Sequence, residues 1–208
     1  MQESDKKSPK IDKDQFPKIL LLFDFIGTMT TRSPTLLGKM VKPNLVTEMN
    51  YVYHSTHLMK LLKYAIDKDP ERVKMAFVST VSRAQALQVV QSCFRHKLLR
   101  EHTSQVLGIF DRNYCKPDDQ RGEEFMQIDL DRILEKLSNE FKKENVLILS
   151  ADPYFTREVS ANQVIISSFC AHTCEDTGPQ QAELVEHLKV IFEGLFKTQM
   201  SVVDYLKT

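Results

Sequence analysis

The sequence has no net charge, because its 28 Lys and Arg residues balance its 28 Asp and Glu residues. This balance argues against a broad binding surface for nucleic acid or for membrane lipids. No apolar run approaches the roughly 18 residues that a transmembrane helix needs, so we expect no direct membrane span. The four cysteines do not make a disulfide framework in 208 residues. They favour a reducing intracellular compartment, either the nucleus and cytoplasm or the mitochondrion.

What is present is typical of a globular protein, with 42% hydrophobic and 27% charged residues. Residues 1–17 are the exception. They are polar and rich in Lys and Asp, and we expect a flexible arm that cannot bury enough apolar surface to offset its ordering entropy. This N-terminus carries acids and no apolar core, so it resembles neither a signal peptide nor a transit peptide. Residues 18–208 are expected to form one domain.

Short apolar runs alternate with segments of helical spacing along that domain. Strands are predicted at residues 19–23, 73–78, 105–110, 146–149 and 164–166, and helices at 57–66, 82–99, 130–141, 180–192 and 200–206. An apolar run without alternation is typical of a strand covered on both faces, as in a parallel sheet. Residues 31–56 predict a small insert or β-flap after the first strand, and residues 111–122 an irregular loop. The pattern therefore predicts an α/β fold, a three-layer sandwich around a central parallel sheet.

Polar side chains follow the carboxyl ends of these strands, where parallel sheets bind ligands. They are Asp24 and Thr28, Ser79 and Thr80, and Asp152, with Lys116 in the loop after the third strand. This set suits phosphoryl transfer. A carboxylate attacks phosphorus, hydroxyl and lysine groups bind the phosphate oxygens, and paired acids hold Mg²⁺.

The same segments resemble a known family. The run from Phe23 to Thr28 is similar to the Asp-x-Asp-x-Thr signature of the haloacid-dehalogenase (HAD) superfamily, whose fold is Rossmann-like. Asn113-Tyr114-Cys115-Lys116 resembles the Asn-Tyr-Val-Lys segment of its FCP/SCP branch, the phosphatases of the RNA polymerase II carboxy-terminal domain. Residues 146–153 resemble the Val-Leu-Ile-Leu-Asp-Asn-Ser-Pro segment of that branch. The resemblance covers roughly residues 18–206, and the branch also includes the presequence receptor of the mitochondrial inner-membrane translocase.

The resemblance implies that Asp24 is the nucleophile and a metal ligand, and that Thr28 and Lys116 bind phosphate. Two motif positions depart from the family. Ile26 replaces the general acid and base, whose assistance is typically worth ~10²–10⁴-fold in rate. Ser150 and Ala151 replace the Asp-Asn pair that completes the metal site.

A third departure concerns the phosphate site. The family's phosphate-binding Thr falls on Val78, so Ser79 and Thr80 are the candidates for that role. Asp152 is the candidate for a shifted metal ligand beside Asp24.

Three functions follow from these matches and departures. We expect foremost a catalytically degenerate phosphatase domain that needs no cofactor and acts as a protein-binding or structural subunit of a larger complex. The first alternative is an active Mg²⁺-dependent phosphoprotein phosphatase with an aspartyl-phosphate intermediate. The second is a mitochondrial translocase-type receptor or a subunit of a mitochondrial assembly.

Each candidate residue also has a simpler interpretation. Asp24 suits a solvated strand end, Thr28 a turn, and Lys116 an ordinary surface position. Asp152 before Pro153, and the Ser79–Thr80 pair, suit the capping of the segments that follow. The run from Cys170 to Cys174 has the residue types of a zinc site but no second pair at usable spacing, so zinc is not favoured.

Overall fold

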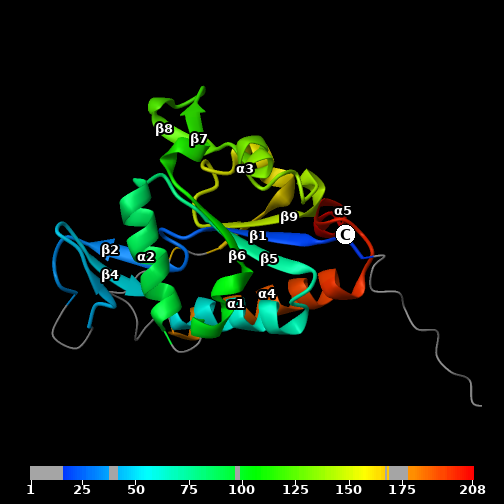
Figure 1. Ribbon diagram of the computed structural model, residues 1–208, viewed down its shortest axis with the longest axis horizontal. Coiled ribbons are helices and arrows are strands. Elements are labelled where there is room, and N and C mark those ends of the chain that lie inside the picture. Colours follow the sequence, from blue (N-terminus) through cyan, green and yellow to red (C-terminus); the bar gives the residue numbers. More distant parts are fainter. Residues whose placement is uncertain (1–15, 38–41, 97–98, 167, 169–177) are drawn as a thin grey trace, which may run out of the picture.

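A computed structural model of the chain describes residues 16–37, 42–96, 99–166, 168 and 178–208 (Figure 1). Its centre is a five-stranded sheet in the order β10-β9-β1-β5-β6, in which every pair is parallel. The strands are β1 (Ile19–Asp24), β5 (Val73–Val78), β6 (Val106–Phe110), β9 (Val146–Ser150) and β10 (Gln163–Ile165). They confirm the five strands predicted from the apolar runs.

The central strand, β1, is buried along its whole length because both of its faces are covered. Leu20 and Leu22 pack in one hydrophobic cluster. Leu21 and Phe23 point the other way into a second cluster. Successive side chains of a strand alternate between faces, so an unbroken apolar run is what a strand covered on both sides requires.

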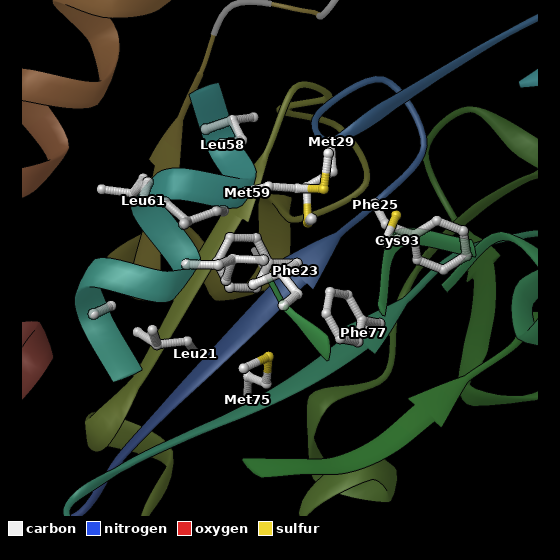
Figure 2. Close-up of a cluster of buried hydrophobic side chains, with 14 of the residues drawn as sticks. Leu21, Phe23, Phe25, Met29, Leu58, Met59, Leu61, Met75, Phe77 and Cys93 are labelled. Atoms are coloured by element: carbon white, nitrogen blue, oxygen red, sulfur yellow. The ribbon is translucent and has the colours of Figure 1, made fainter. Parts of the chain in front are cut away.

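Helices make the outer layers. They are α1 (Thr56–Lys68), α2 (Arg83–Arg95), α3 (Leu130–Lys136), α4 (Gly178–Lys197) and α5 (Val202–Leu206), with short 3₁₀ helices at Arg100–Gln105, Arg112–Tyr114, Lys143–Asn145 and Arg157–Asn162. Figure 1 shows α1 and α4 on one side of the sheet and α3 on the other. The larger cluster joins β1 to α1, α2 and α4, and aromatic rings form part of it (Figure 2). The Phe23 and Phe77 ring centroids lie 5.9 Å apart there.

The segment after β1 forms a separate antiparallel sheet in the order β2-β4-β3. Its strands are β2 (Thr30–Ser33), β3 (Leu45–Val46) and β4 (Tyr51–His54). This is the small insert after the first strand that the sequence predicted. The three-layer α/β architecture is confirmed with it.

The prediction of an irregular loop at residues 111–122 is wrong. A β-hairpin begins there, formed by β7 (Cys115–Asp118) and β8 (Gly122–Ile128). Strand β7 is short and contains Pro117, and β8 begins with exposed residues, so neither carries a periodic signal. The pairing is irregular near the turn, because Pro117 pairs with Met126 and Asp118 with Gly122.

Several helix ends also differ from the prediction. The helix expected to reach residue 141 stops at Lys136, because Ser138 and Asn139 adopt positive φ angles of 56° and 53°. The helix expected to reach residue 99 ends at Arg95, and α4 continues to Lys197.

The described part of the chain contains no helix long and apolar enough to cross a membrane. Residues 1–15 of the predicted arm and the Cys170–Cys174 run lie outside the described residues.

Candidate active site

A pocket of about 320 Å³ opens at the carboxyl ends of β1, β5 and β9. We call it the strand-end pocket. It is lined by Asp24, Ile26, Ser79, Thr80, Arg121, Glu124, Phe125, Met126, Asp152 and Phe155. The structure thus brings together Asp24, Ser79, Thr80 and Asp152 from strand ends that are far apart in the sequence.

Asp24 is the last residue of β1 and is only 7% exposed. The Ser150 hydroxyl, at the end of the neighbouring β9, donates a hydrogen bond of 2.8 Å to Oδ2 of Asp24. Burial raises the pKa of Asp24 to about 7, the Ser150 hydrogen bond offsets part of the rise, and the charge of Asp152 adds to it. The carboxyl group is therefore poorly stabilised in its ionised form.

Ser150 also holds the loop that follows β9. Its oxygen accepts a hydrogen bond of 3.0 Å from the backbone N–H of Asp152. Asp152 in turn accepts one of 2.9 Å from the N–H of Tyr154. Asp152 therefore stabilises its own turn, as the simpler interpretation expected, and also presents a charge to Asp24.

The loop after Asp24 is a tight turn. Gly27 has a φ of +85°, a conformation that favours glycine, and its N–H donates to the carbonyl of Thr30 at 2.7 Å. The Thr28 hydroxyl is buried and donates to the backbone carbonyl of Asp24. This contact directs Thr28 into the turn rather than into the pocket. Ile26 lines the pocket beside Asp24.

Ser79 follows β5 and is 1% exposed. Among the described residues its hydroxyl has no hydrogen-bond partner. A buried polar atom without a partner costs about 1–3 kcal/mol, so such an atom in a pocket wall points to a ligand. Helix α2 has Ser82 as its N-cap residue. The interpretation of Ser79 and Thr80 as the cap of that helix is therefore wrong.

Lys116 lies on β7 and is not among the lining residues of the pocket. Its ammonium group forms an ion pair with Glu158. The hydrogen bond to Glu158 raises the pKa of Lys116. Glu158 also accepts a hydrogen bond of 2.9 Å from Gln127 of β8, so this pair ties the hairpin to the 3₁₀ helix at Arg157–Asn162.

Sequence reasoning missed Arg121, at the turn of the β7–β8 hairpin. Its guanidinium carbon lies 3.9 Å from the ring centroid of Phe125 and 4.5 Å from that of Tyr154. The Asp118 carboxylate accepts hydrogen bonds from the backbone N–H groups of Gln120, at 2.9 Å, and Arg121, at 3.3 Å. The Asp and Gly residues around this turn were the available signal, because both are typical of tight turns.

Three acids line the strand-end pocket, Asp24, Glu124 and Asp152, but they are not gathered around one point as metal ligands are. Nowhere in the described part of the chain do three His, Cys, Asp or Glu side chains gather as a metal site would require. Ser150 offers a neutral hydroxyl and already donates its proton to Asp24. The residues present therefore do not fit the Mg²⁺ site that paired acids would form.

A second polar cluster, under the insert, was also missed. Nε2 of His54 lies 2.7 Å from the Ser92 hydroxyl, which itself donates to the carbonyl of Val89. Nδ1 lies 3.5 Å from Sγ of Cys93. Burial lowers the pKa of His54 to about 4 and raises that of Cys93 to about 12, so both groups are neutral at pH 7. A neutral imidazole and a thiol make a structural link between β4 and α2 rather than a nucleophile.

Comparisons with known proteins found no matching family model and no matching curated protein. Among solved structures, the chain is similar to fission yeast RNA polymerase II CTD phosphatase Fcp1, in an Arg-to-Ala variant bound to beryllium fluoride. The identity is 10% and the TM-score 0.46, over 86% of this chain and 54% of that one.

A second structure of Fcp1 gives 11% identity and a TM-score of 0.44, over 86% of this chain and 52% of that one. A protein described as a HAD family hydrolase, from Streptomyces avermitilis, gives 15% and 0.39 over 77% of each chain. The chain thus spans about half the length of the Fcp1 structures. With TM-scores below 0.5, these similarities place the chain in no family.

Proposed function

We propose that this chain is a HAD-like domain of the FCP/SCP type that has lost efficient catalysis and serves as a protein-binding or structural subunit. The observation that carries the proposal is the contact between Ser150 and Asp24, with a hydroxyl donating to the carboxylate at 2.8 Å. The sequence resemblance assigns the position of Ser150 to a metal-binding Asp. A neutral donor therefore lies where the chemistry needs a charged ligand.

The electrostatics of the pocket support the same conclusion. An attacking carboxylate must be ionised, and a bound cation normally stabilises that form. Here the pKa of Asp24 is raised to about 7 by burial, and Asp152 adds repulsion rather than a matched ligand pair. Without a bound cation, burial therefore disfavours the ionised form that attack on phosphorus requires.

The chain also lacks a general acid and base, because Ile26 stands at that position. Its side chain lines the strand-end pocket at the position that the resemblance assigns to the general acid and base. An alkyl group cannot protonate a leaving group, and that assistance is worth ~10²–10⁴-fold, or about 3–5 kcal/mol of barrier.

Phosphate release from a small aryl phosphate in the presence of Mg²⁺ tests the proposal. We expect the wild-type rate to equal that of Asp24→Asn. A double variant, Ile26→Asp with Ser150→Asp, restores both missing carboxylates and should gain turnover that Asp24→Asn abolishes. Its matched control is Ile26→Asn with Ser150→Asn, which keeps the side-chain shapes without the acids. Clear Asp24-dependent turnover by the wild-type chain would overturn the proposal.

That result would favour the alternative, an active Mg²⁺-dependent phosphatase. One observation favours it already: Asp24 and Asp152 share a pocket with the Ser79 hydroxyl, which has no hydrogen-bond partner among the residues that the structure describes. The mitochondrial receptor or subunit stays a prediction. Identifying the proteins that co-purify with the endogenous chain is the measurement that tests it.

A further inference from the structure

The strand-end pocket has an unusual charge for a site descended from a phosphate-binding one. Three carboxylates line it, from Asp24, Glu124 and Asp152. Arg121 is the only Lys or Arg among its lining residues, since Lys116 pairs with Glu158 outside that set. A phosphate dianion would meet mostly like charge there, whereas a cation would meet opposite charge.

The chain already holds one cation against this pocket. The Arg121 guanidinium contacts the rings of Phe125 and Tyr154 at 3.9 Å and 4.5 Å. Planar guanidinium groups stack on aromatic faces and bind carboxylates through several N–H groups. Arg121 lies at an exposed turn, and it has no ion pair among the residues that the structure describes. Contacts with aromatic faces at an exposed site are individually weak, so another cation could displace Arg121.

Two buried groups in the pocket wall could accept the hydrogen bonds that such a cation would donate. The Ser79 hydroxyl is 1% exposed and has no partner in the described part of the molecule. The Asp24 carboxyl is buried, and within the described part of the chain it accepts a side-chain hydrogen bond from the neutral Ser150 hydroxyl. A guanidinium carries five N–H donors in a fixed fork, enough to reach a carboxylate and a hydroxyl at once.

We infer that the strand-end pocket binds an arginine side chain of a partner protein, with Arg121 as its displaceable intrachain occupant. This inference rests on the proposed binding role and names the chemistry of that role. The partner's guanidinium would donate to Asp24 and Ser79, and its flat face would lie against Phe125. Arginine suits the site better than lysine, because an ammonium group does not stack.

Binding of a minimal probe tests the inference. The probe is Nα-acetyl-arginine amide, and the citrulline analogue is its neutral isostere. Each is titrated into the full chain while the backbone amide signals of Ser79 and Gly27 are followed by NMR. Separate titrations with inorganic phosphate and with MgCl₂ show whether an anion or a metal ion takes the site instead.

Removing the occupant should strengthen binding. Arg121→Gln is expected to raise the affinity for the arginine probe on the order of tenfold. This factor corresponds to Arg121 blocking the site in about nine of ten wild-type molecules. Adding Asp24→Asn should weaken binding by roughly the same factor, the size of one charge-assisted hydrogen bond. Arg100→Gln and Asp131→Asn make the same charge changes away from the pocket and should leave the affinity unchanged. Melting temperatures show that each variant is folded.

Three results would overturn the inference. They are preferred binding of phosphate or Mg²⁺, equal binding of arginine and citrulline, and weaker arginine binding in Arg121→Gln. Phosphate release measured on the same samples keeps the two proposals apart. Turnover would refute the degenerate-enzyme proposal whatever the probe does, and failure of the probe in an inactive protein would refute this inference alone.

Discussion

Replacing Asp24 by Asn should stabilise the protein at alkaline pH and have little effect at acid pH. The pKa of Asp24 is raised from 3.8 to about 7 by burial, and Asn is its neutral isostere. Because the folded pKa lies above the unfolded one, the favourable contribution of the protonated group is complete below about pH 4. It is lost as the pH rises to about 7, where the buried group must ionise.

The magnitude follows from the size of the shift. A rise of about 3 units corresponds to about 4 kcal/mol between the two protonation states. Part of this difference is already lost at about pH 5, and the pocket is open to solvent on one side. We therefore expect Asp24→Asn to gain about 1–3 kcal/mol at about pH 8 relative to about pH 5. The Ser150 hydroxyl can still donate to the amide oxygen, which keeps the packing of the strand ends intact.

Urea unfolding at both pH values measures this difference. The variant must be compared with the wild type at each pH, because other groups titrate over the same range. Asp131→Asn, on an exposed carboxylate paired with Lys143, is the matched control and should show no such gain. The reasoning is refuted if Asp24→Asn changes the free energy of unfolding equally at both pH values.

Three further predictions concern the scaffold. His54→Gln should remove a loss of about 3 kcal/mol that the wild type shows as the pH falls from 6.5 to about 4, because burial lowers the pKa of His54; equal acid sensitivity of both proteins in urea would contradict this. Asn162→Ala should cost about 2–3 kcal/mol, because the buried amide donates to two backbone carbonyls at 2.7 Å and 2.9 Å; a thermal shift no larger than that of the exposed Asn113→Ala would argue against it. Phe77→Ala should cost about 3–5 kcal/mol in urea unfolding, because its ring is buried among other rings; a cost below about 1 kcal/mol would show that the core collapses around the cavity.

The central sheet could be predicted because its signal is local. An unbroken run such as Ile19–Asp24 has few other ways to bury every side chain, so composition alone indicates a strand covered on both faces. The rule that parallel strands end at one edge then placed Asp24, Ser79 and Asp152 near each other. These residues share a pocket because their strands are parallel and adjacent in the sheet, and the apolar runs indicate those strands.

The hairpin could not be predicted, because each of its strands depends on the other strand rather than on a local pattern of its own. Cys115–Asp118 has no alternation that a single-strand pattern would show, and Gly122–Ile128 begins with exposed charged residues. Arg121 consequently went unnoticed, although it lines the pocket. Lys116 was expected at the site, but nothing local in the sequence indicates its ion pair with Glu158.

The predicted helix ends were wrong for a related reason. Apolar spacing continues from Leu130 to Phe141, and Phe141 is indeed buried. Ser138 and Asn139, however, turn the chain through positive φ, so Phe141 reaches the core from a loop. Periodicity reports which side chains are buried, and it does not distinguish a helix from a turn that delivers the same residue.

The most direct test of the central claim is an NMR titration of the Asp24 side-chain carboxyl in the wild-type protein, with and without millimolar Mg²⁺. The claim is that this carboxyl is stabilised by the Ser150 hydroxyl in place of a metal site. It predicts a midpoint near 7 that Mg²⁺ leaves unchanged. A midpoint in the ordinary range of aspartate, or a fall of about one unit or more when Mg²⁺ is added, would contradict it.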